Sequence, residues 1–330
     1  MTAAPCLRAI LGETAFRAGP VGRLATFVTV SANDKELADC GPKALMMLHP
    51  HAGSHGALAL LTCLAAFITG AAQAQSRPSR VASLNLCTDQ LVLALTDRSQ
   101  ILSLSRLAQD ISISFLADQA AGLPMNDGSA ETILFDRPDL VLTGTYGQQE
   151  QIALLRGQAL EVLPLGPWAD LEDGRGQIRT LARRLGHPDR GEALIARIDA
   201  ALERATGIVP VGRSILVYER GGWVMALHSP LNEILVHMGF RLHQEALGLG
   251  QGGVARLETI VTMPPDFMLV DAASSQAVDN GTALFAHRAL AGAVPLDRRL
   301  ALPGQLTICG GPSTPVAIDM LSAAVQARLR

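Results

Sequence analysis

ETILFDRPDLVL at residues 131–142 and ETIVTMPPDFML at residues 258–269 follow one pattern. Both begin Glu-Thr-Ile and an apolar residue, and both reach Pro-Asp and an apolar run at the same spacing. A short helix with its glutamate in the first turn should end before the proline, because the ring disfavours helical geometry in the preceding residue. The apolar run after the aspartate is typical of a buried strand. Each copy therefore predicts a helix-to-strand unit of an α/β layer.

The repetition predicts two lobes built on the same plan, each around its own sheet. Strands that alternate with helices indicate a parallel sheet covered on both faces. The predicted fold class is therefore α/β, with two lobes joined by a single long helix. The alternative is that helix, Pro-Asp and strand form a common α/β junction that arose independently at the two places.

The pattern of apolar residues divides the chain into three parts. The N-terminal lobe is expected at 78–187, with strands at 80–84, 101–104, 140–143 and 161–165 and a helix at 90–95 capped by Thr88 or Asp89. A bridging helix is expected at 188–207, and at ~1.5 Å per residue it would reach about 28 Å, from one lobe to the other. The C-terminal lobe is expected at 211–330, with a strand at 214–218, a helix at 231–238, the second repeated unit, a strand at 306–309 and a last helix from about Pro315.

The first 74 residues are not expected to belong to the folded unit. An apolar run at 57–69 is too short to span a bilayer and is followed by Ala72-Gln73-Ala74, which matches a signal-peptidase site. We interpret 46–74 as a signal peptide and 1–45 as an over-extended start, because Met46 stands at the usual distance from the run. The alternative is a buried helix of the folded domain. The sequence thus predicts a soluble protein, exported to the periplasm, that starts near Gln75.

Composition excludes several classes of function for the exported part. The chain has two lysines, Lys35 and Lys43, and both precede residue 75, so no lysine remains for a phosphate-binding loop or a Schiff base. Residues 75–330 hold 22 Arg against 26 Asp and Glu. A net negative chain without basic clusters is not expected to bind nucleic acid.

Aromatic residues in the exported part follow the predicted strands. Residues 75–330 contain four Trp or Tyr residues, and each lies at or just beyond the carboxyl end of a strand, the edge where open parallel sheets bind ligands. The candidate ligand-binding residues at this edge are Asn85, Cys87, Arg106, Tyr146, Trp168, Tyr218, Arg220 and Trp223. Aromatic rings there suit a large or flat ligand, and the arginines suit an anionic group. The alternatives are that the rings close the two cores and that the arginines are ordinary solvated side chains.

Other motifs do not predict catalysis or metal binding. Gly248, Gly250 and Gly253 match the spacing of a dinucleotide fingerprint, but no convincing strand precedes them, so we expect a flexible loop. The histidines of the exported part show no metal-ligand spacing, and no Gly-x-Ser-x-Gly or His-Glu-x-x-His motif occurs. We predict no catalytic residue, no metal site and no cofactor. An exported α/β enzyme that uses the same cleft is the alternative.

Cys87 and Cys309 are the cysteines of the exported part. One follows the first strand and the other ends a predicted strand of the second lobe, so both should face the cleft. A disulfide would tie the lobes together, and export permits one. Free thiols that contact ligand are the other possibility, and we favour them slightly.

The chain resembles the periplasmic binding proteins of iron-complex and vitamin B12 ABC importers. The resemblance rests on 80–95, on Gly128-Ser129-Ala130-Glu131 with Pro138-Asp139, on the long helix from Pro188 and on the second unit with Pro265-Asp266. It implies two Rossmann-like lobes with a shallow cleft between them that binds a metal chelate, and little closure of the lobes about a hinge. It also implies that the chelate is delivered to a membrane permease dimer, and that the chain contacts the membrane only through this permease.

The resemblance also assigns a role to the glutamates of the repeated units. A helix between two parallel strands runs antiparallel to them, so Glu131 and Glu258 should lie on the rim that holds the cleft, one per lobe. In the family these positions form salt bridges with arginines of the two permease subunits. The alternative is that each carboxylate complements its helix dipole, worth about 0.3–1 kcal/mol.

One departure from the family bears on the ligand. Where the B12-binding members carry an aromatic residue shortly before the docking glutamate, this chain has Met125 in the first lobe and the glycine-rich loop in the second. The departure favours a ferric siderophore or haem over a corrinoid.

Overall fold

Two parallel sheets, one in each half of the chain, form the centre of the structure. The computed structural model describes residues 77–147, 149–273 and 279–329. The expected start at 1–45 and the expected signal peptide at 46–74 lie outside these residues. Residues Gln75–Arg330 make one compact unit, and both sheets belong to it.

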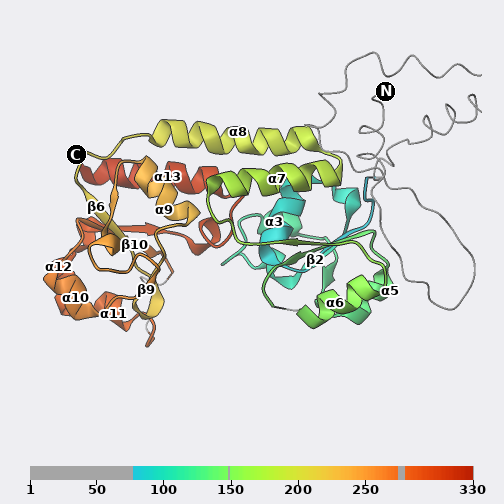
Figure 1. Cartoon of the computed structure of the whole chain (residues 1–330), viewed down its shortest axis with the longest axis horizontal. Coiled ribbons are helices and arrows are strands. Elements are labelled where there is room, and N and C mark those ends of the chain that lie inside the picture. The colour runs from blue at the N-terminus through green and yellow to red at the C-terminus, as the bar shows by residue number, and fades with distance from the viewer. Residues whose placement is uncertain (1–76, 148, 274–278, 330) are drawn as a thin grey trace, which may run out of the picture. The chain divides into compact units, whose positions relative to one another are not determined.

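The N-terminal sheet has five parallel strands in the order β3-β2-β1-β4-β5. These strands span Met125–Asn126, Ile101–Ser105, Val81–Ser83, Leu140–Gly144 and Val162–Leu165 in that order. Helices α3 (Leu86–Leu95), α5 (Ala130–Asp136), α6 (Gln149–Gly157) and α7 (Leu171–Leu185) cover the sheet (Figure 1). The central strands are apolar and fully buried, as expected for a sheet covered on both faces.

The C-terminal sheet has four parallel strands in the order β11-β10-β6-β8. They span Arg299–Leu302, Phe267–Asp271, Ser214–Val217 and Arg241–Leu242. A separate antiparallel pair joins β7 (Trp223–Val224) to β9 (Gly253–Val254). Helices α9 (Pro230–His237), α10 (Leu257–Thr262), α11 (Ala283–Ala286) and α12 (Arg288–Ala293) complete the lobe.

One long helix, α8 (Pro188–Ala205), runs across both lobes (Figure 1). It packs against α7 of the N-terminal lobe and against the final helix α13 (Thr314–Leu329) of the C-terminal lobe. Proline in its first turn suits a helix start, and its buried face carries Leu194, Ile195, Ile198 and Leu202. The fold is therefore the predicted one, with two Rossmann-like α/β lobes joined by a single long helix.

Both repeated units have the predicted form. Helix α5 ends at Asp136 and α10 ends at Thr262, and their C-cap residues, Arg137 and Met263, directly precede a proline. The apolar runs after Asp139 and Asp266 are β4 and β10. Glu131 and Glu258 lie in the first turns of α5 and α10.

Two local predictions are wrong. Helix α3 begins at Leu86, because Asn85 caps it by accepting a hydrogen bond from the Cys87 amide at 2.9 Å, so neither Thr88 nor Asp89 is the cap. No strand forms at 306–309. Residues Gly304–Leu306 form a 3-10 turn, and β11 at Arg299–Leu302 already occupies the edge of the sheet.

Candidate ligand-binding cleft

The strand orders bring four loops together at the carboxyl ends of the strands. In the N-terminal sheet the order reverses between β1 and β4, and in the C-terminal sheet it reverses between β6 and β10. In open α/β sheets, ligands bind in the crevice at this switch point. The loops after β1, β4, β6 and β10 all contribute residues to one cavity.

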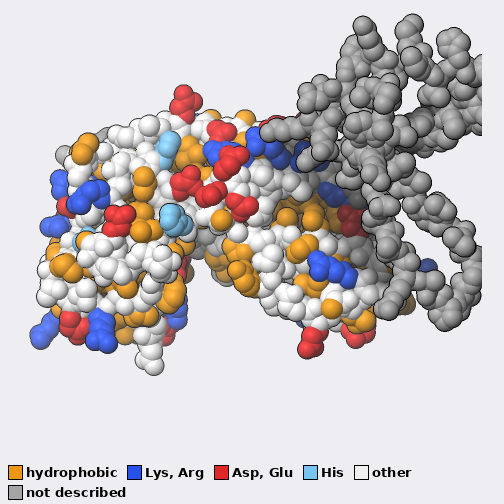
Figure 2. Space-filling view, in the orientation of Figure 1, with side chains coloured by type: hydrophobic (Ala, Val, Ile, Leu, Met, Phe, Trp, Pro, Cys, Tyr) orange, Lys and Arg blue, Asp and Glu red, His pale blue; other side chains and the backbone are white. Residues whose placement is uncertain are grey.

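The cavity has a volume of about 750 Å³ and is lined by both lobes. Its walls are mostly apolar, with a few polar groups from the ends of the strands. Figure 2 shows the notch between the two lobes, with hydrophobic side chains along its edge. A cavity of this size suits a ring-bearing ligand, because small-molecule sites usually measure about 300–1,000 Å³.

Six of the eight candidate ligand-binding residues line this cavity, namely Asn85, Cys87, Tyr146, Trp168, Tyr218 and Arg220. Arg106 and Trp223 are not among the lining residues. Arg106 opens an exposed 3-10 turn after β2, away from the switch point, and Trp223 lies in β7, which pairs with β9. The sequence places both residues after strand ends, but it does not show which loops border the other lobe.

Asn85 and Tyr146 belong to the N-terminal wall. The Asn85 side chain caps α3 and approaches Gly144, where a Cβ would come within 3.1 Å of the amide nitrogen. Glycine at this strand end therefore leaves room for the asparagine. Tyr146 is 81% exposed, so its ring is available to a ligand.

Trp168 lies between a glycine of each lobe. A Cβ on Gly174 of α7 would come within 2.4 Å of the indole ring, and one on Gly310, before α13, within 2.5 Å. The ring therefore occupies a slot that side chains at either position would fill. Trp168 both lines the cleft and joins the two lobes.

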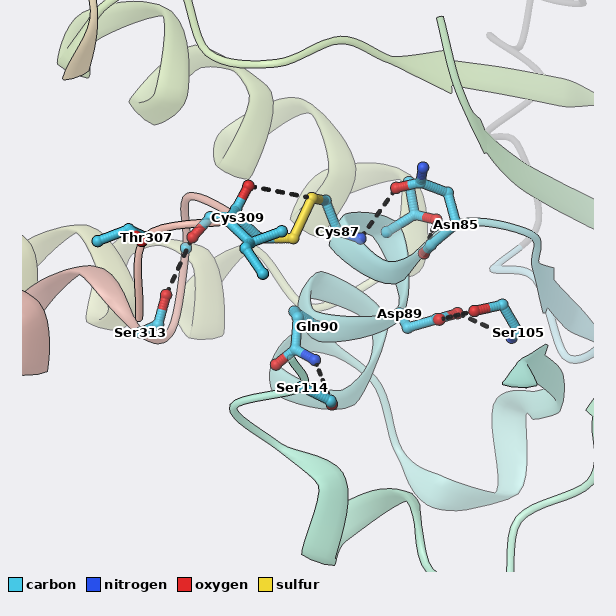
Figure 3. Close-up of a disulfide and its surroundings, with 12 residues drawn as sticks. Asn85, Cys87, Asp89, Gln90, Ser105, Ser114, Thr307, Cys309 and Ser313 are labelled. Atoms are coloured by element: carbon cyan, nitrogen blue, oxygen red, sulfur yellow. Dashed lines mark hydrogen bonds between the residues drawn. A yellow bond between two sulfur atoms is a disulfide. The ribbon is translucent and has the colours of Figure 1, made fainter. Parts of the chain in front are cut away.

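Cys87 and Cys309 form a disulfide, with their Cα atoms 5.1 Å apart, so the expectation of free thiols is wrong (Figure 3). The bond joins the first turn of α3 to the loop before α13. The spacing in sequence, 222 residues, carries no information on this distance. The disulfide ties the lobes at the cavity, beside Trp168.

The C-terminal wall includes Tyr218, which is fully buried although its ring borders the cavity. Its hydroxyl donates to the Ala255 carbonyl at 3.3 Å, and its ring meets Phe285 edge-on at 5.7 Å. Burial raises the pKa of Tyr218, and the charge of Glu258 raises it further. Tyr218 therefore supports this wall and offers the ligand little more than one side of its ring.

Among the described residues, three charged side chains line the cavity, all on the C-terminal wall: Glu219, Arg220 and Asp271. Glu219 and Asp271 were not among the candidate residues predicted from the sequence. Asp271 is the last residue of β10, and Glu219 follows the end of β6 by two residues, directly before Arg220. These positions at the ligand-binding edge were the available signal. Arg220 donates to Asp279 at 2.9 Å. Partial burial raises the pKa of Glu219, and the neighbouring charge of Asp271 raises it further.

The structure describes no metal centre. Among the described residues, no three His, Cys, Asp or Glu side chains are grouped to hold an ion. Gly248 and Gly252, with positive φ angles of 70° and 79°, lie in a loop as predicted, and Gly253 begins β9, so no helix begins at the third glycine of the pattern. None of the described helices is long and apolar enough to cross a membrane.

Comparison with known proteins gives one family and several similar structures. The family model described as periplasmic binding protein matches residues 81–293. No curated protein sequence matches this chain.

The similar structures have low sequence identity. The periplasmic heme-binding protein BhuT, in complex with two hemes, is 21% identical, with a TM-score of 0.61 over 76% of this chain and 99% of that chain. The periplasmic heme-binding protein RhuT from Roseiflexus sp. RS-1 is 22% identical, with a TM-score of 0.59 over 76% and 99%. FhuD2 from Staphylococcus aureus is 13% identical, with a TM-score of 0.57 over 76% and 98%. At these identities the likeness concerns the fold.

Proposed function

The chain belongs to the periplasmic binding protein family, and from this premise we propose that it captures a metal chelate in the cleft and delivers it to the permease of an ABC importer. The observation that carries the proposal is the cavity of about 750 Å³ at the switch points of both sheets. Family membership also favours a binding protein over the enzyme alternative and implies a periplasmic location. The signal peptide at 46–74 stays a prediction.

The cavity suits a large chelate for two reasons. Its apolar walls with few polar groups match the surface of a ring or a chelated metal, whose outer atoms are mostly carbon. Several similar structures are of proteins described as heme-binding or iron-binding, among them BhuT and a protein from Staphylococcus epidermidis. The candidate ligands are a ferric siderophore, haem and cobalamin.

We propose that Asn85, Tyr146 and Trp168 contact the chelate from the N-terminal wall and that Arg220 contacts it from the opposite wall. Cys87 contributes through the disulfide, and Tyr218 through the side of its ring. If the ligand is haem, Tyr146 and Met225 are lining residues with atoms able to bind its iron.

Docking to the permease is the second part of the proposal. Glu131 and Glu258 are exposed in the first turns of α5 and α10, one in each lobe. Two carboxylates in equivalent places suit a partner that presents one arginine from each of two subunits. The membrane is then contacted through the permease alone.

Titration of intrinsic tryptophan fluorescence tests the binding step. The protein is titrated with haem, a ferric trihydroxamate and cobalamin, and at least one is expected to bind with a single saturable change. Trp168 should report it, because its ring lines the cavity. Failure of all three chelates to bind, or chemical turnover of any of them, contradicts the proposed function.

A charge-reversal variant tests the docking step. Glu131→Arg with Glu258→Arg should leave chelate affinity within about twofold of the unchanged protein, because neither residue lines the cavity, and should abolish uptake. The matched control is Asp189→Arg with Glu203→Arg, two exposed acids on α8. Normal uptake by the first double variant, or equal loss in the control, contradicts the docking role.

A further inference from the structure

The charged groups of the cavity are unevenly distributed. The described lining residues include two carboxylates, Glu219 and Asp271, and one guanidinium, Arg220, and all three belong to the C-terminal wall. The N-terminal wall contributes polar groups without charge, among them Asn85, Thr145 and Gln177.

Arg220 is already engaged by the protein. Its guanidinium donates to the Asp279 carboxylate at 2.9 Å, and Asp279 is not a lining residue. A Cβ on Gly281 would come within 2.9 Å of the same guanidinium, so glycine is needed there for the arginine to reach its partner. The positive charge is therefore largely balanced from outside the cavity.

Glu219 and Asp271 lie at the carboxyl ends of two paired strands, Asp271 as the last residue of β10 and Glu219 two residues beyond the end of β6. Strands β6 and β10 pair in parallel, with Val217 opposite Leu269. The Tyr218 amide, one residue beyond β6, still donates to the Leu269 carbonyl at 2.9 Å, so Glu219 leaves the sheet close to the end of β10. Adjacent strands are about 5 Å apart, so the two carboxylates share a small region of the wall. The raised pKa of Glu219, caused by partial burial and by Asp271, agrees with this placement.

We propose that this cleft selects chelates that present a cation or hydrogen-bond donors to Glu219 and Asp271, and that it disfavours chelates with exposed carboxylates. The inference rests on the proposed function and narrows its ligand class. An anionic group on that side of the chelate would face two carboxylates and an arginine already paired with Asp279. A cationic or amide-rich group would find acceptors instead.

Probes that share one chelate core and differ in the charge of a side group test the selection. One series is a ferric linear trihydroxamate whose tail ends in an ammonium group, together with its acetylated and succinylated forms. A second series is an iron porphyrin with two propionates and the same porphyrin with those groups converted to amides that end in ammonium. In the series that binds, we expect the ammonium form to bind about ten- to a hundredfold more tightly than the carboxylate form at low salt.

Two cavity variants should move this preference in a defined direction. Glu219→Gln removes one carboxylate and should reduce the ratio of ammonium to carboxylate affinity by about three- to tenfold. Asp279→Asn frees Arg220 and should also reduce the ratio, by tightening the carboxylate form. The control Glu150→Gln, on α6 and away from the cavity, should leave the ratio unchanged.

The outcomes separate the inference from the proposed function. If no probe of any charge binds, the inference fails, and the proposed function fails with it unless cobalamin binds. If probes bind but the carboxylate forms bind equally well or better, the selection is wrong and the proposed function stands. An unchanged affinity ratio in both cavity variants, with all proteins folded, also overturns the selection.

Discussion

The aspartate of the repeated unit makes the same kind of contact in both lobes, whereas the helix of the unit is capped differently in each. Asp139 accepts from the Ser79 amide at 2.7 Å and from the Ser79 hydroxyl at 3.0 Å, at the start of β1. Asp266 accepts from the Ser214 amide at 2.8 Å and from the Ser214 hydroxyl at 3.0 Å, at the start of β6. The aspartate of each unit therefore fastens its own strand to the first strand of its lobe.

The helix of the unit is held differently in the two lobes. Ser129 caps α5 by accepting from the Thr132 amide, whereas Arg256 precedes α10 and makes no side-chain cap bond. The shared requirement is thus the link between the central strands, and the helix cap is replaceable. This explains why Pro-Asp recurs with the same spacing while the residues before the glutamate differ.

The walls of the cleft differ in a second respect. The N-terminal lobe keeps its one buried carboxylate, Asp89, under the sheet edge, while the C-terminal lobe presents Glu219 and Asp271 to the cavity. Among the described residues Asp89 is the only fully buried acid. The buried acid of the N-terminal lobe therefore takes part in internal hydrogen bonds, whereas Glu219 and Asp271 of the C-terminal lobe line the cavity.

Removing the bond between the lobes should have the largest effect. Cys87→Ala with Cys309→Ala opens a loop closed across 222 residues, and loop-closure entropy predicts a loss of about 3–5 kcal/mol in the free energy of unfolding. For a protein of this size that corresponds to a fall of about 10 °C in Tm, measured by calorimetry. An unchanged Tm would show that α8, α13 and Trp168 hold the lobes without the bond.

One carboxylate in each lobe should change the free energy of unfolding with pH, and the two changes should have opposite signs. Burial raises the pKa of Asp89 to about 7, against hydrogen bonds from Ser105 and Ser83 that favour the charged form. The folded protein then keeps a proton that the unfolded chain has lost above about pH 4, so this group lowers the free energy of unfolding as pH rises from about 4 to 7. We expect Asp89→Asn to remove about 2–4 kcal/mol of that decline, measured by urea unfolding at pH 4.5 and 7.5.

Asp266 of the C-terminal lobe supplies the comparison with opposite sign. Burial alone would raise its pKa, but hydrogen bonds from Ser214 and Arg213 outweigh burial and hold the pKa below its ordinary value. Its contribution to stability is complete above about pH 4 and is lost as pH falls further. If Asp89→Asn and the unchanged protein show the same slope between pH 4.5 and 7.5, Asp89 is ionised in the folded state.

Trp168 and Trp223 should differ in how much they contribute to stability and to chelate binding. Trp168→Ala empties the slot between Gly174 and Gly310 and should cost about 2–4 kcal/mol in unfolding free energy, together with loss of chelate affinity. Trp223 is 48% exposed, and Trp223→Ala should change stability by less than about 0.5 kcal/mol. Both are measured by chemical unfolding and by titration with the chelate. A large loss of affinity in Trp223→Ala would extend the binding site beyond the cavity.

The smallest effects should come from the strand anchors. Asp139→Ala and Asp266→Ala each remove hydrogen bonds to a serine amide and hydroxyl, and we expect each to cost about 1–2 kcal/mol. The two sites lie in different lobes without shared partners, so the losses should add in the double variant. Glu203→Ala on α8 is the control. A much larger loss at one site would mean that the lobes do not share this anchor.

Much of the fold follows from the repeated unit, because strand, proline and aspartate are local signals. The unit predicted β4 and β10, the helices before them and the first-turn glutamates. It did not predict where α3 begins, because Asn85, Thr88 and Asp89 are all suitable cap residues. Asp89 is instead buried within α3 and accepts a hydrogen bond from Ser105 of β2, a contact between distant residues that local signals do not show. The strand predicted at 306–309 failed because strand propensity does not show that the sheet edge is already filled.

The site was predicted less completely than the fold. Alternation of strands and helices placed Asn85, Tyr146, Trp168 and Arg220 at the correct edge of the sheets. Whether a loop at that edge faces the other lobe depends on strand order, which separates Arg106 and Trp223 from the cavity. The pairing of Cys87 with Cys309 depends on a distance between lobes, and the acidic pair depends on strand register.

The disulfide also fixes an order of events during biogenesis. A chain that crosses the membrane from its N-terminus exposes Cys87 to oxidants well before Cys309, which stands 222 residues later. All the strands and helices of the N-terminal lobe precede residue 186, so that lobe can form while its thiol is open. The thiol of Cys87 is masked only after Cys309 and the loop before α13 arrive. A chain stalled before Cys309 therefore keeps a reactive thiol, and the native bond marks a protein in which the first and second lobes have both been translocated as far as Cys309.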